Sequence, residues 1–263
     1  VNPPTTDNFT SQASFQGVTD GTRLGLGVSL DQSGGFFAAL DGRGNVQLYQ
    51  QDSNTTGSGW SFVSTVVATS TQPVESMDLV VVNGIPQVAL ASSDSIQVLD
   101  YRNDAWNSLG NVPWTPASGG VTSPIVAQSA SGATLAVASL ENGGSNWNVQ
   151  VWEWNSTWVP KGLPVIHSTS NPFLSLSLDI AGDGETLVIG DWTIAALAVT
   201  VNVYRWNDPQ GWSSLGSSPS FSWGPVAVTM RNDGQSFAVA TPPPSSALVY
   251  EWNKTSEDWE VVG

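Results

Sequence analysis

Short stretches of alternating apolar and polar residues run through this chain in a fixed order. Residues 174–178 (LSLSL) alternate strictly, the turn 181–184 (AGDG) follows, and 186–190 (TLVIG) form an apolar run. Residues 199–206 (VTVNVYRW) alternate again, and the turn at 207–211 leads to a last short stretch that begins at Trp212. Alternation with a period of two, bounded by Gly, Asn, Asp and Pro, is typical of strands joined by tight hairpins. The pattern predicts four antiparallel strands in this part of the chain.

The same order recurs five times, with boundaries at about residues 18–66, 67–111, 112–164, 165–217 and 218–263. Each unit has a turn glycine, then an aromatic residue or Leu, then a Trp. The glycines are Gly34, Gly84, Gly132, Gly184 and Gly234, the second position holds Tyr49, Leu99, Trp152, Tyr204 and Tyr250, and the Trp residues are Trp60, Trp106, Trp158, Trp212 and Trp259. The second unit is the most degenerate, because Leu99 replaces its aromatic residue.

Repeated units of about 40 to 50 residues with four strands each are typical of β-propeller blades. One such sheet cannot bury both faces by itself, and radial stacking of neighbours buries them all. We therefore predict an all-β chain with almost no helix, folded as one β-propeller domain over residues 1–263 with five blades. A solenoid of hairpins is the alternative. Residues 8–17 (NFTSQASFQG) could add one strand that latches the ring, and a longer parent chain would allow six or more blades.

The units also resemble a known group of repeats. The strings DGETLVIG (183–190), VNVYRW (201–206) and GWSSLG (211–216) are similar to propeller repeats of the FG-GAP and integrin-α-like type. GATLAVAS with VQVWEW (132–154) and DGQSFAVA with LVYEW (233–252) repeat the similarity. The resemblance implies an extracellular adhesion or recognition module, often with calcium bound in a D-x-D-x-D-G loop.

The loops of this chain depart from that calcium pattern. They have the sequences DQSGG (31–35), SASG (129–132), AGDG (181–184) and RNDG (231–234), and none offers three spaced carboxylates. Calcium takes six to eight oxygen ligands. We therefore expect neither a metal nor a cofactor.

Charge and composition restrict the classes of partner that this chain could bind. The chain has 22 acidic and 7 basic residues, a formal net charge of −15, and no Cys. A surface of this sign repels nucleic acid phosphates and anionic lipids, and the apolar runs are far shorter than the roughly 20 residues of a membrane helix. We expect no nucleic acid partner and no membrane insertion. A protein or glycan partner stays open, and because the chain begins at Val1 we expect a processed or excised piece of a larger chain or assembly.

Two patterns could support catalysis. Asp31, Asp78 and Asp179 lie near the ends of the first strands of their units, so they could converge in a central channel as paired carboxylates of a glycoside hydrolase. Asp before a Gly turn is also a common turn former. His167, the only histidine, falls in a connection between units, and no nucleophile motif accompanies it. We expect a surface loop histidine and no enzymatic activity.

The tryptophans suggest a lectin as a second hypothesis, because indole faces stack on sugar rings. The five repeat tryptophans are expected to pack between blades. Four others lie in or beside loops, outside the repeat, and are the candidate ligand platforms: Trp114, Trp147, Trp192 and Trp223.

Four Asn residues begin N-x-S/T sequons, namely Asn8, Asn54, Asn155 and Asn253. The last three occupy the same outer hairpin turn of units one, three and five, where glycans can be accommodated. We expect a secreted glycoprotein that acts as a non-enzymatic interaction, adhesion or structural module.

Overall fold

The computed structural model describes residues 24–52, 59–115, 124–140, 146–168, 176–193, 198–222, 227–241 and 246–263. These residues form 22 strands and no helix, so nothing among them is a helix that could cross a membrane. The strand predicted in residues 8–17 lies outside the described residues.

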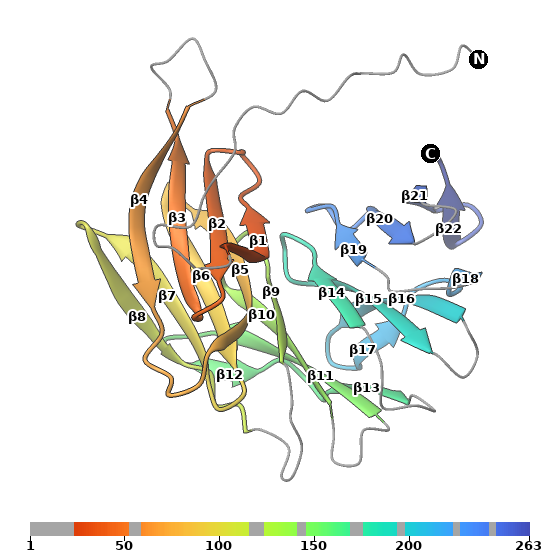
Figure 1. The fold of residues 1–263 in the computed structure, drawn as a ribbon. Helices are drawn as coiled ribbons and strands as arrows, with labels where there is room; N and C mark the ends of the chain where they lie inside the picture. The colour runs from red at the N-terminus through yellow and green to blue at the C-terminus, as the bar shows by residue number, and fades with distance from the viewer. Residues whose placement is uncertain are drawn as a thin grey trace.

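The strands form five antiparallel sheets, each built from consecutive strands in order (Figure 1). We number them blades 1 to 5. Blade 1 has β1 (Leu24–Leu30), β2 (Phe36–Asp41), β3 (Asn45–Gln51) and β4 (Trp60–Val67), and blade 2 has β5 (Val74–Val82), β6 (Ile85–Ser92), β7 (Ile96–Arg102) and β8 (Ala105–Asn111). Blade 3 has β9 (Ile125–Gln128), β10 (Thr134–Leu140), β11 (Asn146–Trp154) and β12 (Trp158–Pro160). Blade 4 has β14 (Leu176–Ile180), β15 (Thr186–Thr193), β16 (Ala198–Asn207) and β17 (Gly211–Ser214), and blade 5 has β19 (Ala227–Met230), β20 (Ser236–Thr241), β21 (Ser246–Asn253) and β22 (Asp258–Val261). The predicted all-β propeller with five four-stranded blades is confirmed.

Two short strands were missed in the sequence. β13 (Val165–Ser168) pairs with β11, and β18 (Ser220–Ser222) pairs with β16, so blades 3 and 4 each gain a fifth strand. These segments have only four and three residues, too few for a clear alternation. The prediction that His167 lies in a loop is wrong, because its backbone pairs with that of Trp147 in the third sheet.

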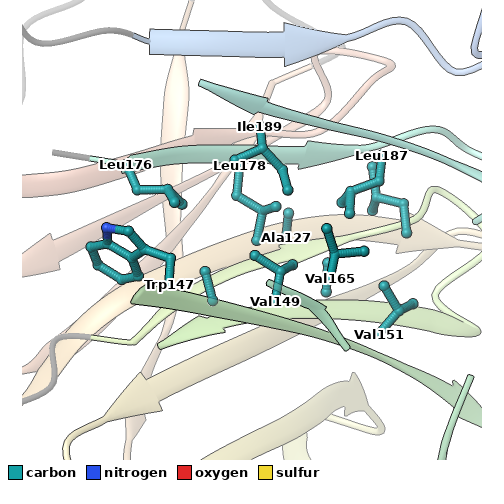
Figure 2. Packing of buried hydrophobic residues seen from close by; sticks show 12 residues of the cluster. Ala127, Trp147, Val149, Val151, Val165, Leu176, Leu178, Leu187 and Ile189 are labelled. Carbon is teal, nitrogen blue, oxygen red and sulfur yellow. The ribbon is translucent and has the colours of Figure 1, made fainter. Parts of the chain in front are cut away.

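The hydrophobic core lies between blades. Alternation along each strand gives every sheet two apolar faces, and consecutive blades pack these faces against each other. Figure 2 shows the cluster between blades 3 and 4, where Val149 and Val151 of β11 meet Leu178 of β14 and Leu187 and Ile189 of β15. Comparable clusters join blades 1 and 2, blades 2 and 3, and blades 4 and 5. Among the described residues, no such cluster joins blade 5 to blade 1.

The first strands of the blades contact one another in the order β1, β5, β9, β14 and β19. They therefore line the axis of the propeller. The hairpin turns at their ends also touch: the backbone N–H of Gly182 donates to the carbonyl of Asn232 at 2.9 Å, and the Gln32 side-chain amide donates to the Asn232 side-chain carbonyl. This last hydrogen bond links blade 1 to blade 5.

Candidate functional site

One position on the axial strands is equivalent in all five blades. It holds the residue that pairs with Ala38, Ala89, Ala136, Val188 or Ala238 on the second strand of its blade. The five residues are Ser29, Asp78, Ala127, Asp179 and Thr229. The sequence had placed Asp78 and Asp179 near a common channel, and the repeat puts them at the same level of it, in blades 2 and 4.

The Asp78 carboxylate connects three blades. It accepts the backbone N–H of Gln128 from blade 3 at 2.7 Å, the Ser29 hydroxyl from blade 1 at 2.9 Å and its neighbour's N–H, that of Leu79, at 2.9 Å. Burial raises the pKa of Asp78 to about 6, and the negative charge of Asp179 adds to the rise against these hydrogen bonds. Its oxygens are committed to holding neighbouring strands.

Asp179 makes the same connection between blades 4 and 5. It accepts the backbone N–H of Met230 at 2.7 Å and the Thr229 hydroxyl at 2.9 Å, and the N–H of Ile180 bonds its other oxygen at 2.8 Å. Burial raises the pKa of Asp179 as well. Both carboxylates therefore act as links between blades.

Asp31 shapes a turn. Its carboxylate accepts the backbone N–H groups of Ser33 at 2.9 Å and of Phe36 at 2.5 Å, closing the hairpin between β1 and β2. An Asp that bonds its own backbone a few residues on is a standard turn former. The turn borders a cavity of about 300 Å³ whose other lining residues include Val80, Val81 and Ala130.

A second concave region lies between the outer strands of blades 3 and 4. Two cavities of about 770 and 470 Å³ share Gly162, Trp206 and Gln210 as lining residues. We call them together the rim groove. The larger cavity is also lined by Glu153, Pro160, Lys161, Glu185, Asn207 and Asp208, and the smaller by Leu163, Pro164, Val165, Ile166, Tyr204, Pro209, Gly211 and Trp212. One end of the rim groove is polar and the other is aromatic and aliphatic.

Trp206 lies between the polar end and the apolar end of the rim groove, because it lines both cavities. The residue is partly buried, and its ring lies 5.6 Å from the Trp212 ring at an interplanar angle of 60°. The Lys161 ammonium lies 5.6 Å from the centre of the Trp206 ring and donates to the Gly184 carbonyl at 3.0 Å. The lack of a side chain at Gly162 allows the Trp206 ring to lie close to this part of blade 3, because a Cβ at residue 162 would lie 2.4 Å from the ring. The rim groove therefore offers an aromatic face beside fixed donors and acceptors.

Two of the four tryptophans proposed from the sequence, Trp114 and Trp147, pack against different clusters between blades. Trp147 is 5% exposed and belongs to the core between blades 3 and 4 (Figure 2), where it cannot serve as an exposed platform. Trp114 is half-buried against the core between blades 2 and 3. Trp192 lies in β15, where its backbone pairs with Val199, and Trp223 lies outside the described residues. A ligand role for Trp114, Trp192 and Trp223 stays a prediction.

Trp206 was missed because it belongs to the repeat. Trp154 and Trp252 hold the equivalent place in blades 3 and 5, each in contact with the Trp that follows it, and repeated residues suggest packing. The signal that could have singled out Trp206 is its surroundings, since Lys161 and Gly162 precede it by one unit and Pro209 and Gln210 follow it.

Two sequons fall within the described residues. Asn155 is exposed and Asn253 is partly exposed, both at the hairpin between the third and fourth strands of their blades. Asn8 and Asn54 lie outside the described residues. Over the same described ranges, no three His, Asp or Glu side chains gather in a way that would hold a metal ion.

No family model and no curated protein matches this chain. Solved structures match its fold at low identity. A protein from Lactobacillus plantarum is 12% identical with a TM-score of 0.57, over 90% of this chain and 69% of that one. AofleA from Arthrobotrys oligospora is 13% identical with a TM-score of 0.57, over 92% and 72%. A Bacteroides fragilis protein provisionally assigned as a 6-phosphogluconolactonase is 12% identical with a TM-score of 0.51, over 89% and 82%. These similarities support the propeller fold alone.

Proposed function

We propose that this chain is a non-enzymatic binding module, and that its ligand is a neutral saccharide held in the rim groove. The observation that carries the proposal is the partly buried Trp206, which lines both cavities. A sugar ring has one face of C–H groups and a rim of hydroxyls, so it needs an aromatic surface with hydrogen-bonding groups beside it.

The polar end of the rim groove supplies those groups. Lys161 and the amides of Asn207 and Gln210 are donors, and the carboxylates of Glu153 and Glu185 are acceptors. The single ammonium of Lys161 is already bonded to a backbone carbonyl. Together with the net charge of −15, this favours a neutral ligand over an anionic one.

The axial carboxylates support a non-enzymatic role. A two-carboxylate glycosidase needs one carboxyl as acid and the other free to act as base or nucleophile. Asp78 and Asp179 both accept backbone N–H groups of the next blade, and Asp31 closes its own turn. Each of the three therefore already has a structural role, which supports a binding module over a hydrolase.

Secretion and glycosylation belong to the same proposal. Asn155 and Asn253 lie at the outer tips of their blades, where an attached glycan would project away from the axis. The intact mass of material secreted by a eukaryotic host should exceed the polypeptide mass of 27.7 kDa and fall after treatment with an N-glycosidase. An unchanged mass would remove the glycoprotein part of the proposal.

Binding is tested by titrating neutral and acidic oligosaccharides while recording tryptophan fluorescence. Replacing Trp206→Leu should weaken the binding of a neutral sugar roughly two- to tenfold, the range expected for one aromatic contact. Trp252→Leu alters the equivalent aromatic in blade 5 and should leave affinity unchanged. Gln210→Ala is a milder second variant if Trp206→Leu folds poorly. Equal loss in the Trp206 and Trp252 variants, or no response to any sugar, would overturn the assignment.

The enzymatic alternative is tested on the same protein. Because one structural neighbour is provisionally a 6-phosphogluconolactonase, the panel should contain sugar lactones as well as aryl glycosides. We expect no turnover above buffer. Hydrolysis that disappears in Asp78→Asn or Asp179→Asn would show that the axial carboxylates are catalytic.

A further inference from the structure

Blade 5 and blade 1 face each other with surfaces that are built like interior ones. We call this boundary the seam. Val28 on β1 holds the position of Val228 on β19, judged by their pairing with Ala39 and Val239. Val28 is 64% exposed, whereas Val228 is 8% exposed against blade 4. The same side chain in the same place of the repeat is covered in one blade and uncovered in the other.

Two more positions show the same contrast. Leu30 is 58% exposed, and its counterpart Met230 is 7% exposed. On the opposite wall, Val249 of β21 is 38% exposed, and its counterpart Val203 of β16 is 2% exposed between blades 4 and 5. Large exposed apolar surfaces with this geometry mark sites that another segment covers.

The rim contact between neighbouring blades is also missing at the seam. A Cβ on Gly162 or Gly216 would meet the Trp206 or Trp252 ring of the next blade at 2.4 and 2.9 Å. Gly263 is the equivalent of these glycines, four residues after Trp259, and no atom of the described residues lies within 4 Å of its Cβ position. Blade 1 offers Gln51 at the place of the partner tryptophan. The seam is therefore not closed by the repeat itself.

We propose that residues 8–18 of this chain cover the seam. The segment is tethered through residues 19–23 to Leu24 of β1, the strand that carries Val28 and Leu30. The six residues from Thr19 to Leu24 can span about 20 Å at roughly 3.3 Å per residue, comparable with the length of a strand. A tethered segment also competes at a high effective concentration against any free partner.

The chemistry of the segment fits the two walls. Phe9, Ser11, Ala13 and Phe15 alternate in the sequence, and in an extended segment this order would place two phenyl rings and the small residues between them on one face. The blade 5 wall has a cavity of about 210 Å³ lined by Thr229, Ala238 and Val249, among others, which would accept a phenyl ring.

Charge favours this segment over a second copy of the chain. Residues 1–23 contain two Asp and one Arg, for a formal charge of −1, whereas each complete chain carries −15. Two copies meeting at their seams would bring like charges together, and the segment adds almost none.

Cysteine cross-linking tests the proposal cleanly, because the chain has no Cys of its own. The pair Phe15→Cys with Val249→Cys should form a disulfide within the monomer under mild oxidation. Phe15→Cys with Leu163→Cys is the matched control, since Leu163 is highly exposed on the rim of blade 3, and this pair should give none. A seam pair that links only between molecules, or that links no more than the control, would overturn the proposal.

A stability measurement gives an independent answer. Phe9→Ser combined with Phe15→Ser should lower the denaturation midpoint and increase the binding of an apolar dye. Val28→Ser combined with Leu30→Ser should lower the denaturation midpoint too. All four changes together should lower the midpoint by less than the sum of the effects of the two double variants. An unchanged midpoint in the Phe9 and Phe15 double variant, or full additivity, would contradict burial of the segment in the seam.

Discussion

The backbone N–H of Met230 donates to the Asp179 carboxylate at 2.7 Å, across the boundary between blades 4 and 5. Gln128 and Asp78 repeat this contact between blades 3 and 2 at the same distance. Replacing Asp179→Ala would leave the partly buried Met230 N–H without its acceptor, which costs about 1 to 3 kcal/mol. Chemical denaturation should show this loss. Asp179→Asn keeps an accepting oxygen and should lose less, and equal losses in the two variants would contradict the link.

Stability should increase as the pH falls from about 7 to about 4. Burial raises the pKa of Asp78 and of Asp191 to about 6, from an unfolded value near 3.8. The folded state therefore binds these protons more tightly, so stability is highest when both are protonated and is lost as the pH rises through about 6. Each group contributes about 1 to 3 kcal/mol.

The measurement is the urea midpoint at several pH values. The variants Asp78→Asn and Asp191→Asn are controls that should flatten the dependence of this midpoint on pH. Asp94 affects stability in a separate, lower pH range. Hydroxyl groups of Ser70 and Ser92 hold the pKa of Asp94 down to about 2, so its contribution is lost only below about pH 4. A urea midpoint that falls steadily from pH 7 to pH 5 would refute the raised pKa values of Asp78 and Asp191.

Gly162→Ala should destabilise the chain more than Gly110→Ala. Both glycines have positive φ, 75° and 98°, so both substitutions impose backbone strain of about 1 to 2 kcal/mol. A Cβ at Gly162 would also meet the Trp206 ring at 2.4 Å, whereas at Gly110 the nearest atom, on Trp154, is 3.8 Å away. The difference between their melting temperatures isolates the contact with the ring. Equal effects would mean that Trp206 moves aside freely.

Trp259→Phe should cost more than Trp158→Phe. The Trp259 indole N–H donates to the carbonyl of Leu215 in the preceding blade at 2.9 Å, while the buried indole N–H of Trp158 has no hydrogen-bond partner among the described residues. Both side chains are buried, so both changes lose similar packing, and only the first leaves a carbonyl unpaired, a difference of about 1 kcal/mol. Thermal unfolding of the two variants checks this, and the reverse order would be inconsistent with it.

The propeller could be predicted from the sequence because its signals are local. The alternation in VTVNVYRW (199–206) and the turn glycines specify strands and hairpins residue by residue, and a repeat of four strands implies stacked sheets. β13 and β18 were missed because their place depends on pairing with β11 and β16, which are distant in sequence.

The candidate site was harder to predict, because contacts between blades decide which side chains are exposed. Trp147 lies beside a loop in sequence, yet packing of blade 4 against blade 3 buries it. Trp206 follows the repeat, yet it lines two cavities together with Gly162 of the preceding blade. Asp78 and Asp179 were expected near the axis, but their hydrogen bonds to the next blade depend on register that no pattern in one sequence shows.

The most direct test of the account is an NMR titration that follows the indole N–H signals with a neutral oligosaccharide. The Trp206 signal should shift in a saturable way while that of Trp252, its counterpart in blade 5, stays in place. Shifts confined to residues around the axis, such as Ser29, Gln128 and Thr229, or consumption of the sugar during the titration, would contradict it.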